Sequence, residues 1–314
     1  MALMKPNSIR AVPEDLAFLA MTHHRLGDDK AAQKMLARLR SLLQEPRFRR
    51  SGEAMGFLRE AEALIEIGNE PAVTAVSPVP APLREAYNLD PFYEKYLDVG
   101  GVPILASREV SDDALLVARS IVRYMMSGHP ELYEPLRQHK IRIAIIGANQ
   151  ATTDIPEHRD LPTANPETDW NRRARGFGAT KQRPACSVGE ENLLALEGDR
   201  YRGENILVHE FAHTMADMAV QKLDSEFVKK LEAAYSQAIT NGLWRDTYAA
   251  TNSSEYWAEG VQSWFDTNLE NSKPDGTHNH VNTRDELRVY DAALAALIAE
   301  WLPDDDRRLR YPGF

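Results

Sequence analysis

Apolar residues along the chain alternate between helical spacing and short continuous runs. The helical spacing predicts helices over residues 13–26, 30–44, 52–67, 87–97, 112–126, 131–139, 226–240, 255–266 and 284–301. The continuous runs predict strands over residues 102–107, 141–147 and 192–196. Together these elements predict an α+β fold that is preceded by a small all-helical segment.

A proline-rich stretch separates the first helices from the rest of the chain. Residues 69–83 contain four prolines, which is typical of an extended linker. We therefore predict a helical segment over residues 1–68, a linker over 69–86 and a larger domain over 87–314.

The helical segment is similar to a single tetratricopeptide repeat. Leu26 and Gly27 take the position of the turn in such a repeat, and Ala32 takes its close-packing position. One repeat cannot bury its own apolar face. We therefore expect this segment to dock on the larger domain, to oligomerise or to be the remnant of a longer array, with a protein partner as a further expectation.

The strongest chemical signal lies in residues 206–218, where two histidines flank a glutamate. The spacing His209-Glu210-x-x-His213 places both histidines one above the other on a helix face. The neighbouring apolar residues predict that this helix is buried, and buried histidines need partners. Such a pair can bind a metal ion, and the glutamate can take a proton from a metal-activated water molecule.

A third ligand is expected elsewhere, because a catalytic zinc site combines three protein ligands with one open position. Glu255 and Glu259 lie one turn apart on a predicted helix, which Ser253 or Ser254 would cap. This placement suits one metal ligand and one carboxylate that orients a ligand. Asp217, near the end of the histidine helix, is a second candidate for the orienting role.

At these residues the chain resembles the gluzincin zinc metallopeptidases. A glutamate followed four residues later by a second acid is similar to the gluzincin pattern, and Tyr248, seven residues before Glu255, looks more narrowly like the catalytic domain of anthrax lethal factor and the Pro-Pro endopeptidases. The resemblance implies a zincin-like domain, with helices packed on a small mixed sheet, that binds Zn²⁺ and hydrolyses peptide bonds as an endopeptidase. It assigns zinc ligation to His209, His213 and Glu255, the general base to Glu210, oxyanion binding to Tyr248 and the orientation of His209 to Glu259.

The expected partner is a peptide or protein substrate, and three stretches are candidates for contacting it. The predicted strand at 192–196 would, as the resemblance implies, pair with a substrate backbone through Asn192, Leu193 and Leu194. The aperiodic stretch 148–184 would frame the cleft.

Charged side chains add further candidates for substrate contacts. Within the aperiodic stretch these are Arg172, Arg173 and Arg175. His278 and His280 would point the same way on a strand, so they are candidates for a substrate contact or for a second metal site.

Net charge narrows the class of partner. Residues 1–85 carry 12 basic and 11 acidic side chains, which leaves 25 basic and 36 acidic ones, a balance of −11, for residues 86–314 out of a total of −10. Nucleic-acid binding needs a basic surface, so no nucleic-acid partner is expected. No apolar run reaches the length of a membrane span or a secretory signal, so we expect a cytoplasmic protein without a membrane partner.

The single cysteine, Cys186, excludes an intramolecular disulfide and fits a reducing compartment. Its thiolate is a candidate for filling the open zinc position, and the simpler interpretation is a small buried residue. Two alternative functions stay open at this point. One is a non-catalytic binding protein stabilised by zinc, and the other is a zinc hydrolase of a non-peptide amide.

Overall fold

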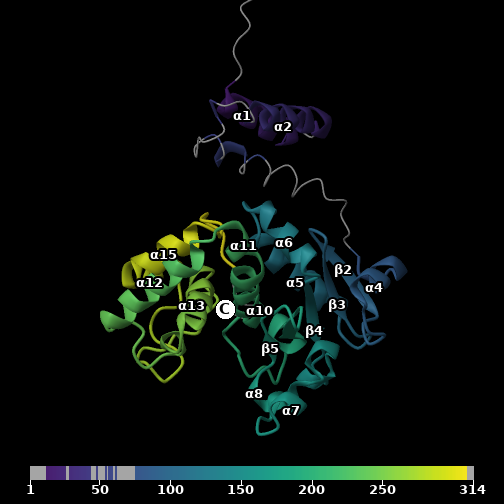
Figure 1. Ribbon diagram of the computed structural model, residues 1–314, viewed down its shortest axis with the longest axis vertical. Helices are drawn as coiled ribbons and strands as arrows, with labels where there is room; N and C mark the ends of the chain where they lie inside the picture. The colour runs from purple at the N-terminus through teal and green to yellow at the C-terminus, as the bar shows by residue number, and fades with distance from the viewer. Residues whose placement is uncertain are drawn as a thin grey trace, which may run out of the picture. The chain divides into compact units, whose positions relative to one another are not determined.

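The computed structural model describes residues 12–25, 28–43, 47–48, 54, 56–58, 61 and 75–309. The chain divides into two compact units, residues 1–72 with 127–130 and residues 73–126 with 131–314. In the first unit, α1 (Pro13–Arg25) packs against α2 (Asp29–Leu43), as Figure 1 shows. Both helices confirm their predictions.

The first unit has its own small apolar core. Leu16, Ala20, Ala32 and Leu36 are all buried in it, so Ala32 occupies the close-packed position that the sequence indicates. The predicted turn at residues 26–27 and most of the third helix, 52–67, lie outside the described residues. A role for this unit in binding a partner stays a prediction.

The second unit contains one small mixed sheet. Its strands are β1 (Ser77–Pro78), β2 (Lys95–Val99), β3 (Val102–Ala106), β4 (Arg142–Ile146), β5 (Gly176–Phe177) and β6 (Ala185–Gly189). Their spatial order is β1-β2-β3-β4-β6-β5. The three central strands β3, β4 and β6 are parallel, whereas the outer strands pair antiparallel. Helices packed on a small mixed sheet confirm the predicted α+β class.

Figure 1 labels many of the helices of the second unit, which are numbered in chain order. The longer ones are α5 (Asp112–Met125), α10 (Ile206–Met215), α12 (Phe227–Thr240), α13 (Ser253–Trp264), α14 (Arg284–Tyr290) and α15 (Ala292–Ala299). The shorter ones are α4 (Ala81–Tyr87), α6 (Tyr133–Gln138), α7 (Leu161–Ala164), α8 (Trp170–Arg173), α9 (Glu190–Leu193) and α11 (Gln221–Leu223). The helix predicted over 284–301 is two helices, because Asp291 adopts a non-helical conformation (φ −139°) and caps α15.

Two predictions near the start of this unit are wrong. The described part of the predicted linker contains β1 and α4, and α4 ends at Asn88, which is in the left-handed region (φ 50°). No helix follows over 87–97, because Lys95–Val99 pairs with β3 as a hairpin. Gly100 and Gly101 make the turn with φ of 59° and 78°, a conformation that glycine adopts without strain.

The strand predicted over residues 192–196 is also wrong. Asn192 and Leu193 end the short helix α9, and the strand of this region is β6, just before it. The Asn192 side chain donates to the carbonyl oxygen of Glu204 at 2.9 Å and accepts from the amide of Ile206 at 2.8 Å. Asn192 is therefore a buried residue that closes the loop before α10, and it does not belong to a strand. The strand β6 lies inside the sheet, between β4 and β5.

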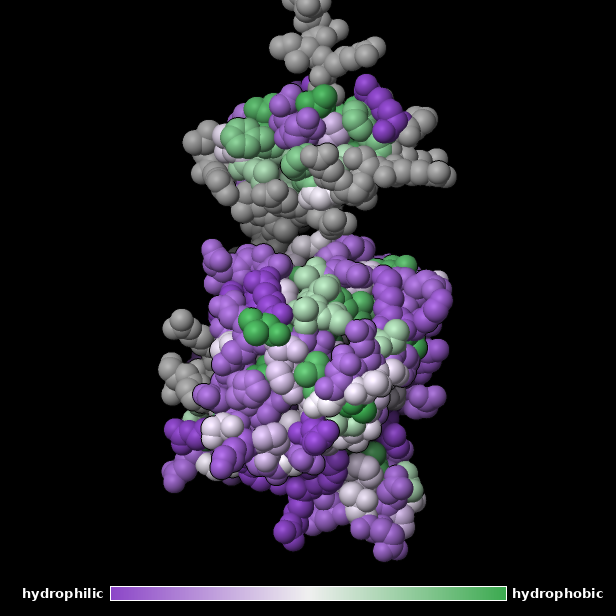
Figure 2. Space-filling view, turned by 90° about the vertical axis from the view of Figure 1, so that its left-hand side faces the viewer, coloured by the Kyte–Doolittle hydropathy of each residue, from purple (hydrophilic) through white to green (hydrophobic). Residues whose placement is uncertain are grey.

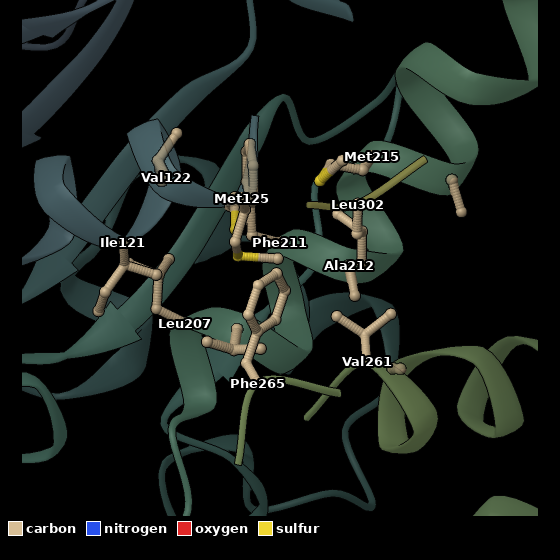
Figure 3. Close-up of a cluster of buried hydrophobic side chains, with 14 of the residues drawn as sticks. Ile121, Val122, Met125, Leu207, Phe211, Ala212, Met215, Val261, Phe265 and Leu302 are labelled. Carbon is tan, nitrogen blue, oxygen red and sulfur yellow. The ribbon is translucent and has the colours of Figure 1, made fainter. Parts of the chain in front are cut away.

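The core of the second unit surrounds one face of α10 (Figure 3). Leu207, Phe211 and Met215 from this helix are fully buried between α5 and the segment that follows α13. Burial of each such side chain contributes about 2 kcal/mol. In addition, the Trp257 indole of α13 donates to the carbonyl oxygen of Ala212 at 3.0 Å. Packing on this face fixes the orientation of the other face of α10, which carries the two histidines.

The stretch 148–184 is compact, although it has no long element. It contains turns of 3-10 helix at Thr152–Asp154 and Pro156–His158, then α7, α8 and β5. A buried ion pair between Arg175 and Glu191, with 2.6 Å between Nε and Oε1, attaches this stretch to α9. The stretch therefore forms a fixed wall beside α10.

His158 is a buried histidine behind β5. Its Nε2 lies 2.8 Å from the Ser187 hydroxyl, and its ring contacts Phe177 edge-to-face at 5.0 Å. Burial lowers the pKa of His158 from 6.5 to about 4. The neutral ring is therefore favoured in the folded state, whereas the unfolded chain takes up a proton at a higher pH.

We expect His158 to make the free energy of unfolding pH-dependent. The contribution is complete above pH 6.5 and is lost as the pH falls towards about 4, in total about 3 kcal/mol. Denaturant titrations of the wild type and of His158→Gln between pH 4 and pH 7.5 measure it. Their stability difference should shrink as the pH falls, and parallel pH profiles would contradict this role.

One face of the second unit is mostly polar. Figure 2 shows hydrophilic side chains over most of the face in view, with hydrophobic ones in small groups. In the part of the chain that the structure describes, no helix has both the length and the apolarity that crossing a bilayer requires.

Candidate metal centre

The helix α10 begins at a polar cap and presents two histidines to one side. Asn205 caps it by accepting from the amide of Val208 at 3.2 Å. His209 and His213 then follow at one-turn spacing, and their rings meet edge-to-face at 4.8 Å between centroids. The sequence prediction of two histidines on one helix face describes this arrangement correctly.

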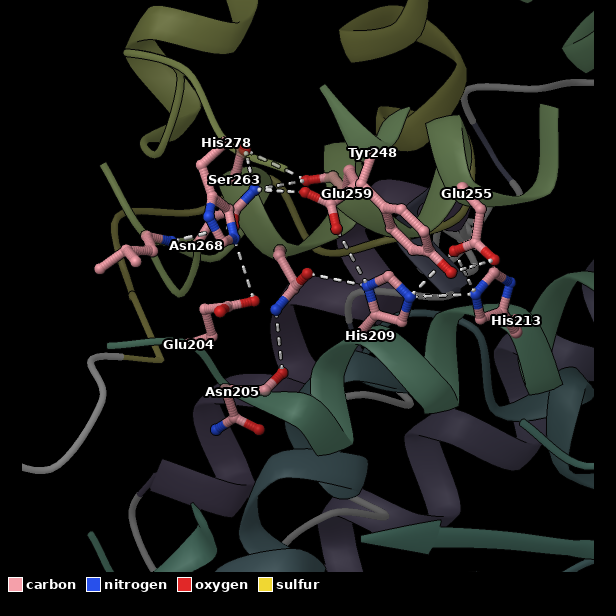
Figure 4. Close-up of polar contacts among 12 residues, drawn as sticks. Glu204, Asn205, His209, His213, Tyr248, Glu255, Glu259, Ser263, Asn268 and His278 are labelled. Atoms are coloured by element: carbon pink, nitrogen blue, oxygen red, sulfur yellow. Dashed lines mark hydrogen bonds and ion pairs between the residues drawn. The ribbon is translucent and has the colours of Figure 1, made fainter. Parts of the chain in front are cut away.

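The helix α13 supplies the third group. Asn252 caps it, with the Glu255 amide donating to its side chain at 2.9 Å, so the predicted caps Ser253 and Ser254 are wrong. The Ser254 hydroxyl instead lies 2.9 Å from Nδ1 of His213. Glu255, in the first turn, points at the histidines (Figure 4).

Three ligand atoms converge between the two helices. Nε2 of His209 and Nε2 of His213 are 3.1 Å apart, and each lies 3.2 Å from Oε2 of Glu255. Tetrahedral zinc with bonds of about 2.0–2.1 Å requires about 3.3 Å between its ligand atoms. Among the described residues these three form the group that can hold a metal ion. The spacing therefore fits zinc.

The state of the His209 ring supports the same conclusion. Its Nδ1 lies 2.8 Å from Oε1 of Gln262, an amide oxygen that only accepts, so Nδ1 carries the proton. With this proton on Nδ1, a deprotonated Nε2 directs its lone pair towards Glu255 and His213, as metal binding requires. A cation between these three atoms would then be favourable.

Gln262 takes the role that the sequence assigns to Glu259 or Asp217. Glu259 Oε1 is 3.5 Å from Nδ1 of His209, and its other oxygen accepts from Asn268 at 3.0 Å. Glu259 is thus a second, longer partner of the histidine. Asp217 is exposed and accepts from Gln221 at 2.8 Å, so assigning it to His209 is wrong.

The pKa values of His209 and Glu255 reflect both their burial and the charged groups around them. Burial alone would lower the pKa of His209, but the hydrogen bond with Glu255 and the charges of Glu210 and Glu259 raise it to about 10. Burial would raise the pKa of Glu255, whereas the two histidines hold it well below its usual range. Both shifts favour positive charge beside the Glu255 carboxylate, which a proton on His209 or a bound metal ion can supply.

Glu210 lies beside the ligand atoms and against the edge strand. Burial raises its pKa, and the amide of Gly178 donates a hydrogen bond to its carboxylate. A Cβ at Gly178 would lie 2.8 Å from Cβ of His213, and one at Gly176 would lie 2.8 Å from Cγ2 of Ile206. These glycines let β5 approach α10 closely, so that the carboxylate is held between strand and ligands.

Tyr248 completes the site from the turn Tyr248–Ala250. Its hydroxyl lies 3.3 Å from Oε1 of Glu255, and its ring is roughly parallel to that of His209 at 6.4 Å. Arg173, which lines the same cavities, lowers the pKa of this hydroxyl from the opposite wall, although burial raises that pKa more. Tyr248 is thus half-buried beside the ligand atoms, where the sequence places it.

Two cavities flank this centre and share part of their lining. One, of about 330 Å³, is lined by Tyr201, Glu204 and Thr277 beyond His209. The other, of about 450 Å³, extends past His213 to Trp170. Both are lined by Arg173, Ala174, Gly176, His209, Glu210 and Tyr248. A chain passing from one cavity to the other would cross the ligand atoms.

Several predicted substrate residues do not lie in this cleft. Asn192 and Leu193 are buried structural residues, and Leu194 is half-buried and lines neither cavity. Arg172 is exposed outside both cavities, and Arg175 lines one of them but is paired with Glu191.

His278 and His280 lie in a loop and diverge. Nε2 of His278 is 3.2 Å from Oε2 of Glu204, whereas the ring of His280 contacts Tyr290 at 5.3 Å. They form neither a strand pair nor a second metal group within the described residues. His278 acts on the cleft only through Glu204.

Cys186 lies in β6 beneath α10 and is fully buried. Burial raises the pKa of its thiol, and Thr214 is its hydrogen-bond partner. The thiol is not part of the ligand group, so the simpler interpretation of a small buried residue is confirmed and the alternative of a zinc ligand is wrong. Among the described residues no further histidine, cysteine, aspartate or glutamate joins the three ligand atoms.

We expect Gln262→Leu to weaken zinc binding by about 10- to 100-fold, because Nδ1 of His209 loses the acceptor that orients it. Competition with a chelating dye measures the affinity. Gln262→Glu keeps an acceptor at this position and is the matched control. Equal affinities of the wild type and the leucine variant would contradict this role.

In comparisons with protein-family models, with curated proteins and with solved structures, nothing matches this chain.

Proposed function

We propose that the protein is a zinc-dependent endopeptidase whose second unit is a zincin-like domain of the gluzincin type. One observation carries this proposal. Nε2 of His209, Nε2 of His213 and Oε2 of Glu255 lie within 3.2 Å of one another, and the neighbouring side is left open to two cavities. A closed set of four protein ligands would favour a structural metal, whereas three ligands favour catalysis.

A bound zinc ion would supply polarisation of the scissile carbonyl group and acidification of a water molecule to a pKa of about 7. Glu210 accepts a proton from that water molecule while the water oxygen forms a bond to the carbonyl carbon. The same carboxylic acid then gives the proton to the leaving nitrogen as the C–N bond breaks. Burial raises the pKa of Glu210, which makes its carboxylate a stronger base than a solvent-exposed one and so supports the proton transfer.

Tyr248 supports the proposal as a donor to the carbonyl oxygen. Its hydroxyl is 3.3 Å from the ligand Glu255, so it lies beside the position where negative charge develops. Burial raises the pKa of Tyr248, which keeps the phenol protonated and able to donate. A donor of this kind contributes about 10² to 10³ in rate.

An extended peptide is the substrate class that the cleft favours. The strand β5 is at the edge of the sheet, antiparallel to β6, and Gly176 lines both cavities. The free edge of β5 can pair with a peptide backbone, which would carry the scissile bond across the centre. This role replaces the strand that the sequence predicts over residues 192–196.

The test is cleavage of a peptide library by the zinc-loaded full chain, with products identified by mass spectrometry. The proposal predicts internal cleavage that a chelator stops and that zinc restores. A set of small non-peptide amides serves as the comparison. Turnover of these amides without any peptide cleavage, or no turnover at all, would contradict the proposal.

A further inference from the structure

Arg173 lies at the centre of the cleft, although no step above uses it. It ends α8 and lines both cavities, so it faces the same space as Glu210 and the ligand atoms. Tyr248 lines the same two cavities, and the Arg173 guanidinium acts on its hydroxyl electrostatically. That hydroxyl is 3.3 Å from Oε1 of Glu255, whose carboxylate also acts on the guanidinium.

Arg173 is solvent-exposed, and among the described residues no carboxylate forms an ion pair with it. The Tyr248 hydroxyl and the Glu255 carboxylate act on the guanidinium and raise its pKa. Arg175, two residues further on, is by contrast buried and paired with Glu191 at 2.6 Å. A cation that no carboxylate binds directly can attract negative charge that develops in the cleft.

The backbone that carries Arg173 is held firmly. Asp169 caps α8 by accepting from the amide of Arg172 at 3.3 Å. The hydroxyl of Thr152 donates to the carbonyl oxygen of Ala174 at 2.8 Å, and Arg200 donates to that of Arg172 at 2.8 Å. The wall therefore presents the Arg173 side chain from a fixed position, as a preorganised donor requires.

We propose that Arg173 is a catalytic residue that binds the oxyanion of the tetrahedral intermediate together with Tyr248. This inference rests on the proposed function. A carbonyl oxygen that accepts from the Tyr248 hydroxyl lies in the cavities that Arg173 also lines, within reach of its long side chain. The charge on that oxygen forms as the water oxygen adds and disappears as the C–N bond breaks. Arg173 contributes hydrogen bonds and positive charge, and it transfers no proton.

The alternative role for such an arginine is an anchor for a carboxylate of the substrate. An anchor binds the ground state, so its loss raises KM, whereas loss of an oxyanion donor lowers kcat. The place of Arg173 in the cavities that Tyr248 also lines favours the oxyanion, because it brings the guanidinium to the reacting carbonyl group and not to a distant end of the peptide.

The test compares Arg173→Gln and Arg173→Lys with Arg172→Gln, an exposed neighbour outside both cavities. For Arg173→Gln we expect kcat to fall by about 10² to 10³ with KM changed less than about threefold, because a donor used only in the transition state is lost. Lysine, which keeps the charge, should restore part of kcat. Unchanged zinc content and melting temperature exclude a folding defect.

A second arm measures binding without turnover. A phosphonamidate peptide mimics the tetrahedral anion, and calorimetry with the zinc-loaded variants should show binding weakened by about 10² in Arg173→Gln. Binding of the parent peptide to a Glu210→Gln background should be nearly unchanged. If the wild type cleaves no peptide, the proposed function fails, and this arm alone decides the role of Arg173.

Three results would overturn the inference. One is an unchanged kcat in Arg173→Gln. Another is equal affinity of wild type and variant for the phosphonamidate. The third is a loss confined to KM that disappears when the peptide carboxy-terminus is amidated, which would identify a carboxylate anchor.

Discussion

Replacing Glu210 by glutamine is expected to lower kcat by about 10² to 10⁴ while zinc stays bound, because general-base catalysis is lost and the ligand set is intact. Glu210 is not one of the three convergent ligands. Its carboxylate accepts from the amide of Gly178, and a glutamine oxygen can accept the same hydrogen bond. Steady-state kinetics with metal analysis on the same sample measures both quantities.

Asp217→Asn is the matched control for this variant. Asp217 is an exposed carboxylate two residues beyond the end of α10, and it lines one cavity but contacts Gln221. Its loss should change kcat less than about threefold, since its carboxylate is hydrogen-bonded to Gln221 and does not belong to the ligand group. A Glu210→Gln variant as active as the wild type would show that another group takes the proton.

Glu255→Gln is expected to produce the largest loss of metal affinity, well beyond the about 10- to 100-fold that follows removal of a partner outside the ligand set. Oε2 of Glu255 is the only carboxylate oxygen within 3.2 Å of both ring nitrogens among the described residues. Two neutral imidazoles supply no negative charge to balance the metal ion. An amide oxygen does not supply it either, whereas the Glu255 carboxylate does. Activity should fall together with zinc content.

Thermal unfolding gives an independent measure of this loss. Zinc at 100 times its dissociation constant stabilises the folded wild type by about 2.7 kcal/mol, so its melting temperature rises on zinc addition. The same zinc concentration should leave Glu255→Gln nearly unchanged. Glu259→Gln, one turn further on, should still be stabilised by zinc, because its carboxylate reaches only Nδ1 of His209 at 3.5 Å. A wild type insensitive to zinc would contradict the site.

The sequence predicts the ligand site because its residues lie within single helices. Spacing of one turn places His209 above His213, and Glu255 lies one turn from Glu259 on its own helix. Gln262 follows Glu255 by seven residues, which is about two helical turns. Helical spacing alone therefore could have placed both residues on the same face. The resemblance instead assigns the orientation of His209 to Glu259.

The wall of the cleft depends on contacts between distant segments. Gly178 lies against α10 only because β5 pairs with β6, and no local pattern marks a strand of two residues. Arg173 acts on Tyr248 across 75 positions of sequence, held by caps and by Arg200. The apolar run after Gly189 resembles a strand, but the side chain of Asn192 closes a loop there instead. Tertiary contacts of this kind override local preference.

The most direct measurement is crystallography of the zinc-soaked protein with anomalous data on both sides of the zinc absorption edge. The account predicts one strong anomalous peak within about 2.0 to 2.2 Å of Nε2 of His209, Nε2 of His213 and a carboxylate oxygen of Glu255, with a fourth position open to solvent. Zinc bound elsewhere, or held by a fourth protein ligand, would contradict it.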